Sequence, residues 1–245
     1  MSRAPVLLPL LAAALILVSG AASAQEITLS LGDDASLTGR SILLIALLTV
    51  LSIAPGLAIM VTCFPFIVTV LSILRQALGL QASPPNMLIV SLALFLTWYI
   101  MEPVFLEAWT VGIQPLLDGQ LDIEAAFAAG IEPFRVFMAG RVDEGTFVEL
   151  ASLRPNVETG ADIAQAPLSV LVPSFLLSEV ARAFEIGFLI FLPFLIIDLV
   201  VSAVLMSMGM MMVPPAIVAL PFKLAFFVVA DGWALISGAL VRSYF

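Results

Sequence analysis

The sequence predicts an all-α integral membrane protein, built from two long, kinked helical hairpins with a small, acidic helical insertion between them. Hydrophobic residues make up 62% of the chain and charged residues only 11%. A soluble domain is about 45–50% apolar and about 25% charged, so this composition indicates a membrane protein. Long uncharged runs alternate with short turn signals, and ten of the 18 acidic residues gather in one central segment.

Residues 1–24 have the pattern of a cleaved secretory signal peptide. Arg3 precedes an apolar core of about 13 residues, and small residues ending at Ala24 form an A-x-A cleavage site before Gln25. The alternative is an uncleaved first membrane helix, but a span needs about 20 apolar residues. Cleavage would leave residues 25–40 as a short periplasmic segment at the mature N-terminus.

The first hairpin is predicted over residues 41–106. No charged residue interrupts the chain from Ser41 to Leu74, which is more than one span requires. We therefore expect this helix to be broken or kinked near Pro55 and Pro65.

A tight turn is predicted between the two helices of this hairpin, at residues 79–86. Glycine stops the first helix, two prolines prevent its continuation, and Asn86 can cap the next helix. The predicted turn residues are Arg75, Gly79, Pro84 and Pro85.

Residues 107–165 form a predicted water-exposed, helical insertion. This segment holds ten acidic residues and three arginines. Its acidic balance fits the periplasmic side. Because topology follows basic residues more than acidic ones, Arg75 would then lie on the cytoplasmic side.

The second hairpin is predicted over residues 166–245, with the methionine-rich segment 206–212 as its turn. Six ionisable residues occur in its apolar runs: Glu179, Arg182, Glu185, Asp198, Lys223 and Asp231. An ionisable group in such surroundings is costly unless it is paired or hydrated. We therefore expect these residues to pair within the membrane or to make contacts between subunits.

Spacing suggests how the charges pair. Glu179, Arg182 and Glu185 are three residues apart, so both acids can reach Arg182 on one helix, as a purely structural triad or a functional one. Asp198 and Lys223 are nearly equidistant from the middle of the turn. Antiparallel helices would place them at similar depth, so we predict a contact within one subunit or across two. Locking of subunits is the favoured role, and a proton relay is the alternative.

Composition also excludes several classes of function. The net charge is −9 and no basic cluster is present, which argues against a nucleic-acid partner. The chain has no histidine, so Ser-His, Cys-His and metal-histidine chemistry are excluded. Its one cysteine, Cys63, lies in an apolar run and is predicted to be a buried, inert thiol. We expect no cofactor, no metal site and no enzymatic activity.

Three segments resemble one family of membrane proteins. The first is "VLSILRQALG" at 70–79. The second is "VPSFLLSEVARAFEIGFLIFLPFLIIDLVV" at 172–201, with Ser178-Glu179, Gly187-Phe188 and Phe191-Leu192-Pro193. The third is "VPPAIVALPFKLAFFVVADGW" at 213–233, with Pro221-Phe222-Lys223 and Asp231-Gly232-Trp233. Over residues 40–245, together with the signal peptide, the chain is similar to the FliP/SctR family of type III secretion export-gate proteins.

The resemblance implies a specific assembly. Five copies would combine with FliQ-like and FliR-like membrane subunits into a helical cone, which unfolded flagellar proteins cross. The protein would be a multi-pass protein of the bacterial inner membrane, located in the flagellar basal body with the other membrane proteins of the export apparatus. The signal peptide and the acidic insertion favour the flagellar branch over the alternative, an export-gate subunit of a virulence-type system. One segment departs from the family, which often has Thr-x-Phe-x-Arg where this chain has Thr62-Cys63-Phe64-Pro65-Phe66.

The methionine-rich turn is the predicted functional site. Taken singly, Met206 and Met208 would fill gaps in a core. Three adjacent methionines point in different directions, so one core cannot use Met210, Met211 and Met212 together. In five copies around an axis, as the resemblance implies, they could form an apolar ring that excludes ions and water and still deforms around a passing chain. We predict that these three form a channel seal, flanked by Met206 and Met208.

Two other classes of function are alternatives to the export gate. An intramembrane aspartyl enzyme would need two acids at one depth, and Asp198 and Asp231 are the available pair. A small-solute transporter often has broken helices and repeated halves, and Pro55-Gly56 suggests such a break. The two hairpins are not recognisably related to each other, which disfavours the transporter, and no nucleotide-binding loop is visible.

Overall fold

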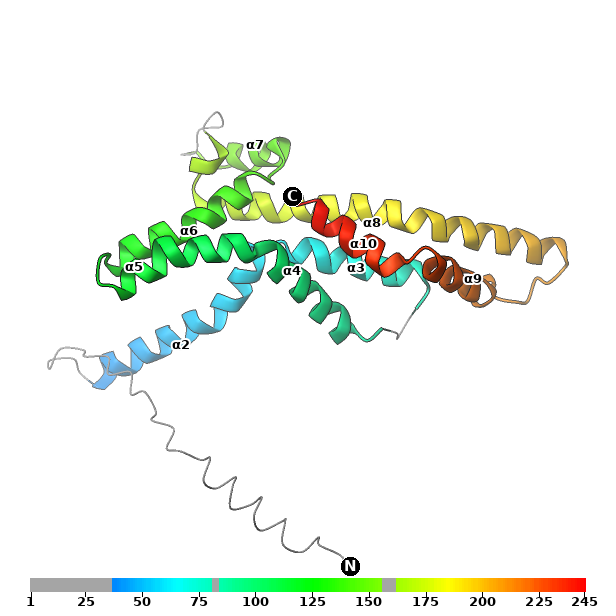
Figure 1. The fold of residues 1–245 in the computed structure, drawn as a ribbon, viewed down its shortest axis with the longest axis horizontal. Coiled ribbons are helices and arrows are strands. Elements are labelled where there is room, and N and C mark those ends of the chain that lie inside the picture. The colour runs from blue at the N-terminus through cyan, green and yellow to red at the C-terminus, as the bar shows by residue number, and fades with distance from the viewer. Residues whose placement is uncertain (1–36, 81–83, 156–161) are drawn as a thin grey trace, which may run out of the picture. The chain divides into compact units, whose positions relative to one another are not determined.

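The computed structural model describes residues 37–80, 84–155 and 162–245, and every regular element in these residues is a helix (Figure 1). The predicted signal peptide, its cleavage site at Ala24 and Gln25, and most of the segment 25–40 lie outside the described residues. The helices are α2 (Leu37–Met60), α3 (Phe64–Ala77), α4 (Asn86–Ala108), η1 (Trp109–Ile113), α5 (Gln114–Leu117), α6 (Ile123–Ala139), α7 (Glu144–Ser152), η2 (Ile163–Gln165), α8 (Leu168–Ser207), α9 (Pro215–Val229) and α10 (Gly232–Arg242).

The chain divides into two units, one ending at Leu51 and one spanning Ser52–Phe245. The described part of the first unit consists of the early turns of α2, in which Ile42, Ile45 and Leu48 are exposed. All the sites considered below belong to the second unit.

The first apolar run is broken, but not at both of its prolines. Pro55 lies inside α2 and does not end it. The break falls at residues 61–63, where the Thr62 hydroxyl donates to the carbonyl of Ile59 (2.8 Å) and accepts from the amide of Phe64 (3.4 Å). Pro65 follows in the first turn of α3, where a missing N–H costs nothing. The prediction of a break near Pro65 is therefore confirmed, whereas the helix is not broken at Pro55.

In the turn predicted at residues 79–86, of which 81–83 lie outside the described residues, Gly79 ends the helix as expected. Gly79 has a φ of +77°, and its amide and that of Leu80 donate to the carbonyls of Gln76 (2.9 Å) and Arg75 (3.3 Å). This paired arrangement closes a helix with glycine in the left-handed region. Asn86 was expected to cap α4, but its side chain makes no cap; it accepts a hydrogen bond from the Arg75 guanidinium across the turn.

The boundary predicted at residue 107 does not coincide with a helix end. Helical structure continues from Asn86 to Leu117 through α4, a π-helical turn at η1, and α5. The helices α6 and α7 then begin with aspartate caps, in which Asp122 and Asp143 accept from the amides of Ala125 and Thr146 (2.8 Å each).

The second hairpin is built on α8, a helix of 40 residues that contains Pro173 and Pro193. Helix α3 packs along it, and the approach is close because a Cβ on Gly187 would lie 2.4 Å from the Cδ1 of Ile73. Helices α9 and α10 fold back beside α8 and are bent by 61° at Asp231, which has a φ of +48° (Figure 1). The main core lies where α3, α4, α8 and α10 meet, and it includes Phe66 and Cys63, both fully buried.

Two helical segments are long and apolar enough to cross a membrane, namely Asn86–Leu117 and Leu168–Ser207. In the described residues the number rises to as many as four if α2 with α3, and α9 with α10, each form one broken span. The all-α fold with membrane-spanning helices is thus confirmed, by the length and composition of the helices.

Candidate functional site

The methionine-rich segment forms the turn of the second hairpin. α8 ends at Ser207, and Gly209 then has a φ of +76°. The amides of Gly209 and Met210 donate to the carbonyls of Met206 and Leu205 (3.0 Å each), so the helix is closed in the same way as α3. Pro214 and Pro215 start α9. Glycine on one side and two prolines on the other therefore fix a short, non-helical turn around residues 210–213.

The methionine side chains of this turn point away from the core of the single chain. Met211 is 85% exposed and Met212 is 97% exposed, while Met210 is about half exposed. Met206 and Met208 are also exposed, so the expectation that they fill gaps in a core is wrong for the isolated chain. They lie on the last turn and the cap of α8.

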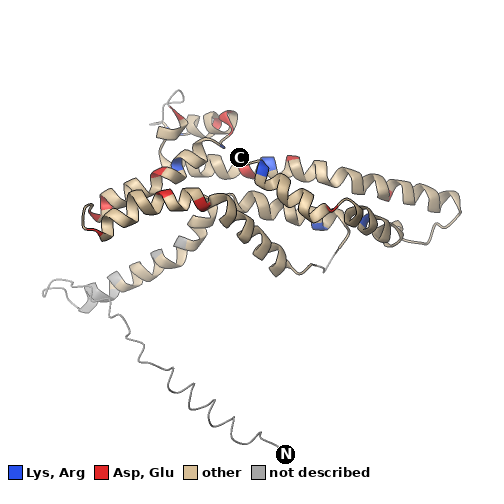
Figure 2. Cartoon of the chain, viewed as in Figure 1, with Lys and Arg blue, Asp and Glu red and all other residues tan. Residues whose placement is uncertain are grey.

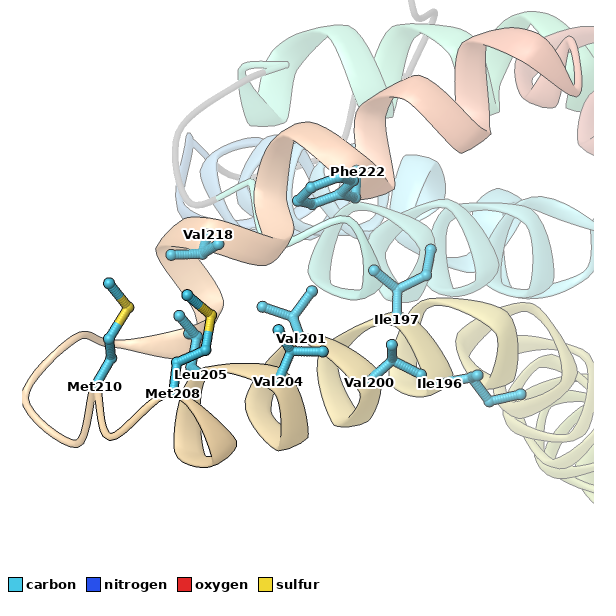
Figure 3. Close-up of a pocket in the computed structure, with 10 residues that line it drawn as sticks. All are labelled: Ile196, Ile197, Val200, Val201, Val204, Leu205, Met208, Met210, Val218 and Phe222. Carbon is cyan, nitrogen blue, oxygen red and sulfur yellow. The ribbon is translucent and has the colours of Figure 1, made fainter.

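An apolar groove of about 600 Å³ runs from this turn between α8 and α9. Figure 3 shows Met208 and Met210 at one end of the groove and Ile196 and Ile197 at the other. No polar side chain lines it. Methionine side chains are unbranched and have several rotatable bonds, so this end of the groove can change shape at low cost.

This end of the hairpin is free of charge. Residues 199–222 contain no Asp, Glu, Lys or Arg, and Figure 2 shows the tip of α8 and the turn without red or blue. An uncharged, flexible and exposed apolar tip can exclude ions and water where several such tips meet. It offers no group for acid–base chemistry.

The predicted contact between Asp198 and Lys223 is present within one chain. The Lys223 Nζ lies 2.6 Å from the Asp198 Oδ2 and donates also to the carbonyl of Ala77 (3.0 Å). Lys223 is buried, and Ala77 is the last residue of α3. An ammonium group at a helix C-terminus is favourable, because the carbonyls there carry partial negative charge. Lys223 therefore ties together α3, α8 and α9.

The second cluster of charges surrounds Glu179, whose side chain is fully buried on α8. Its Oε1 lies 3.1 Å from the Arg141 Nε and 3.6 Å from the Arg182 Nη1, and its Oε2 accepts a hydrogen bond from the Tyr244 hydroxyl. Arg141 also donates to the carbonyl of Ser243 (2.8 Å), and its guanidinium carbon lies 4.0 Å from the centre of the Tyr244 ring. The cluster thus joins α8 to the segment before α7 and to the C-terminus.

Tyr244 acts as a donor in this cluster. Burial, followed by the charge of Glu179, raises the pKa of its hydroxyl far above the usual range, so the group stays protonated. Its ring packs edge-on against Phe66 and is stacked on Phe137. Phe66 stands in the segment that departs from the family pattern, and here it contributes to the packing around the cluster.

Two of the predicted charge contacts are not formed within the described part of one chain. Glu185 is exposed and makes no ion pair in the described part of the chain, so the triad centred on Arg182 is wrong. Among the described residues Arg182 pairs only with Glu179, and the second cation at Glu179 is Arg141, 38 residues before Glu179. Asp231 is exposed at the bend between α9 and α10 and pairs with no cation among the described residues.

Sequence reasoning missed Arg141 and Tyr244. Arg141 is one of only three basic residues in the acidic insertion, and Tyr244 is one of two tyrosines in the chain. Their scarcity was only a weak indication that they take part in a buried cluster. The contacts themselves depend on tertiary packing over 38 and 65 residues of sequence, which no local spacing reveals.

The fold and these sites define a class: a helical membrane protein whose long hairpins are held by buried charges and end in an exposed apolar turn. Comparison with known proteins gives the family, since the model of the FliP family matches residues 47–240. The chain is 50% identical to the flagellar biosynthetic protein FliP of Caulobacter vibrioides, over 99% of this chain and 91% of that protein.

Other relatives with the same name are similar over most of their length. The FliP of Agrobacterium fabrum is 48% identical over 95% of this chain and 96% of its own length. That of Bacillus subtilis is 45% identical over 86% of this chain and 96% of its own length. The chain therefore belongs to the FliP family and is a membrane-associated component of the flagellar type III export apparatus. The names of these relatives include no catalytic activity.

Proposed function

We propose that this protein is the core, channel-forming subunit of the flagellar export gate and that its methionine turn is a deformable seal. Identical copies around one axis would bring Met210, Met211 and Met212 together in an apolar ring. The single observation that carries the proposal is the exposure of these side chains at an uncharged helical tip. An exposed apolar patch of this kind is costly in water and indicates a contact surface.

The rest of the exposed surface supports assembly with other helices. Apolar residues on the outer half of α8, among them Leu199, Val200 and Val204, are more than half exposed in the single chain. We infer that copies of the chain, about five of them, and FliQ-like and FliR-like membrane subunits cover these faces. The complex would cross the inner membrane within the flagellar basal body and pass unfolded proteins without altering them chemically.

The buried charges serve this function indirectly. Lys223 with Asp198, and Glu179 with its partners, bond inside one chain and hold the second hairpin in a fixed geometry. Their proposed role is to keep the flexible turn on a rigid support. This differs from the subunit locking predicted from sequence, because each of these ion pairs lies within one chain.

The seal can be tested by replacing Met210, Met211 and Met212 with alanine in the assembled gate. Ion flux through the gate should rise by an order of magnitude or more, because three long side chains per copy are removed from the ring. The amount of assembled complex should stay the same, since these side chains are exposed. An unchanged flux in a fully assembled complex would refute the seal.

A matched control and a stiffness variant sharpen this test. Met60 and Met87 are also exposed but lie far along the chain from the turn, and their replacement by alanine should leave the flux unchanged. Replacing the three turn methionines with isoleucine keeps the ring apolar and makes its side chains stiffer. We expect this variant to slow export more than it changes ion flux.

A further inference from the structure

The methionines of the chain differ widely in their exposure. Met101 and Met138 are fully buried, whereas Met211 is 85% exposed and Met212 is 97% exposed. Half of the ten methionines lie in the seven residues 206–212, and all five of these are exposed in the single chain. The methionine turn is therefore a dense cluster of accessible thioether sulfurs.

The other reactive sulfur of the chain is a thiol, and it is shielded. Cys63 is the one cysteine and is fully buried in the main core. Outside the turn, the exposed methionines of the described residues are Met60 and Met87, which stand singly. Oxidants reach sulfur side chains according to their exposure. An oxidant dissolved in water therefore meets the methionine turn before it meets the thiol.

The surroundings of the turn are unfavourable for an added oxygen. Met208 and Met210 lie at one end of the apolar groove between α8 and α9, and no polar side chain lines that groove (Figure 3). Residues 199–222 contain no charged side chain either. A sulfoxide oxygen accepts hydrogen bonds, and burying a polar group without a partner is costly. An oxidised methionine would therefore leave these apolar surroundings and stay in water.

We propose that the methionine turn is a site of reversible oxidation and that sulfoxide formation opens the seal. The effect on the seal rests on the function proposed above, whereas the site itself rests on the exposure of its side chains. Oxidation converts a flexible apolar side chain into a polar one, and an apolar constriction excludes ions only while it stays dry. Because a ring that closes a passage borders water on both faces, a small oxidant can reach its side chains.

The oxidant is a peroxide, of which hydrogen peroxide is the simplest. The thioether sulfur attacks one peroxide oxygen, so that an S–O bond forms and the O–O bond breaks. The proton on the attacked oxygen passes to the departing hydroxide, which leaves as water. Sulfur thus loses two electrons and the peroxide is reduced. Methionine sulfoxide reductases reverse the change, one enzyme for each sulfoxide epimer, as their thiols form a disulfide and the oxygen leaves as water.

The first test maps the oxidised residues by mass spectrometry. The full-length protein in membrane vesicles is treated briefly with dilute hydrogen peroxide and then digested. Sulfoxide should form at Met211 and Met212 at least about tenfold faster than at the buried Met101 and Met138, because reaction follows exposure. Equal rates at these four residues would overturn the inference.

The second test measures ion flux through the assembled gate before and after the same treatment. We expect the flux to rise by about tenfold or more and to fall again after incubation with both reductases. The amount of assembled complex is measured in each sample. A rise that came only from loss of the complex, or that the reductases did not reverse, would contradict the inference.

Matched variants locate the effect. Leucine at all five methionine positions of 206–212 removes the sulfurs and keeps the side chains apolar, so peroxide should not raise the flux of this variant above its own untreated value. The control variant Met60→Leu with Met87→Leu loses the two other exposed sulfurs and should respond to peroxide as the unaltered protein does. An equal rise in the variant without turn methionines would place the effect elsewhere.

Oxidation and substitution together separate this inference from the seal itself. If peroxide oxidises the turn without changing the flux, while alanine at Met210, Met211 and Met212 raises it, the seal stands and the oxidative opening is refuted. If neither change raises the flux, the seal is refuted, and the oxidative opening with it.

Discussion

The Glu179 cluster and the methionine turn both belong to α8, and they differ in how firmly their side chains are held. At Glu179 a fully buried charge is held by two arginines and a tyrosine from distant segments. At the turn, five exposed methionines make no polar contact through their side chains and keep their rotational freedom. Burying a charge is tolerable only with such partners, and they fix its position. The difference indicates that one end of α8 is rigid by construction and the other is adaptable.

The comparison predicts that replacing Glu179 causes the largest loss in the free energy of unfolding. Glu179→Ala leaves the largely buried Arg141 without its carboxylate, and removing one partner of a buried pair costs about 3–5 kcal/mol. Chemical denaturation in detergent should show a loss of that size in the free energy of unfolding. Glu132→Ala is the control, since the Glu132 side chain is 58% exposed in its pair with Arg135 and pairs open to solvent contribute about 1 kcal/mol or less. Equal losses in the two variants would mean that the cluster does not hold the fold.

A smaller effect is expected at the second charge contact, which is partly exposed. Lys223→Met removes the ammonium and leaves Asp198 with a buried oxygen, at a cost of about 2 kcal/mol. The double variant Asp198→Leu with Lys223→Met should recover most of this loss, because an apolar pair of similar size often replaces a buried ion pair without cost. Thermal melting of the single and double variants decides the point. A double variant less stable than either single variant would show that each residue has its own separate partner.

The close contact between η1 and α6 at Gly112 and Gly130 gives a test of packing alone. Gly112→Ala places a Cβ 2.8 Å from the Gly130 Cα and should cost about 1–3 kcal/mol, as overpacking does. Gly130→Ala is its matched partner in the same crossing, because its Cβ would meet nothing closer than 3.8 Å. That variant should be neutral or slightly stabilising, since alanine favours a helix. If both substitutions proved equally harmful in thermal melting, the crossing would be symmetric and the geometry given above would be wrong.

The least effect on folding is expected at the methionine turn. Met211→Ala and Met212→Ala should change the free energy of unfolding by less than about 0.5 kcal/mol, because exposed side chains with no special contact contribute little. A large loss of stability in the isolated chain would show that the turn is part of the core, and the contrast with Glu179 would disappear.

Sequence alone predicted what depends on local rules. The helical turn at Gly79 and the contact between Lys223 and Asp198 followed from glycine conformation and from the symmetry of an antiparallel hairpin. The triad could not be decided by local rules. Glu179 and Glu185 each lie three positions from Arg182, rotated by about 60° in opposite directions, so spacing treats them alike. Only the packing shows that the buried Glu179 pairs with Arg182 while Glu185 is exposed.

What could not be predicted depends on contacts between distant segments. Glu179 meets Arg141 and Tyr244 only because α3, α6 and the C-terminus converge on α8. The helical continuation from α4 through η1 and α5 to Leu117 was not predicted, because the change from apolar to acidic residues near Glu107 was taken as the start of the insertion, although charge and helicity vary independently. The exposure of Met206 and Met208 likewise becomes clear only when the course of α9 beside α8 is known.

Crosslinking between methionine turns is the measurement that bears on the proposed seal with the fewest assumptions. Cys63 is the chain's one cysteine and is fully buried, so Met211→Cys introduces a single accessible thiol. If the turns of several copies meet around one axis, mild oxidation of the assembled gate should give disulfide-linked pairs of chains, since a disulfide needs Cβ atoms about 4 Å apart. Met87→Cys, also exposed, should not crosslink. Free thiols at position 211 that react with a lipid-soluble reagent and never with each other would contradict a shared methionine ring.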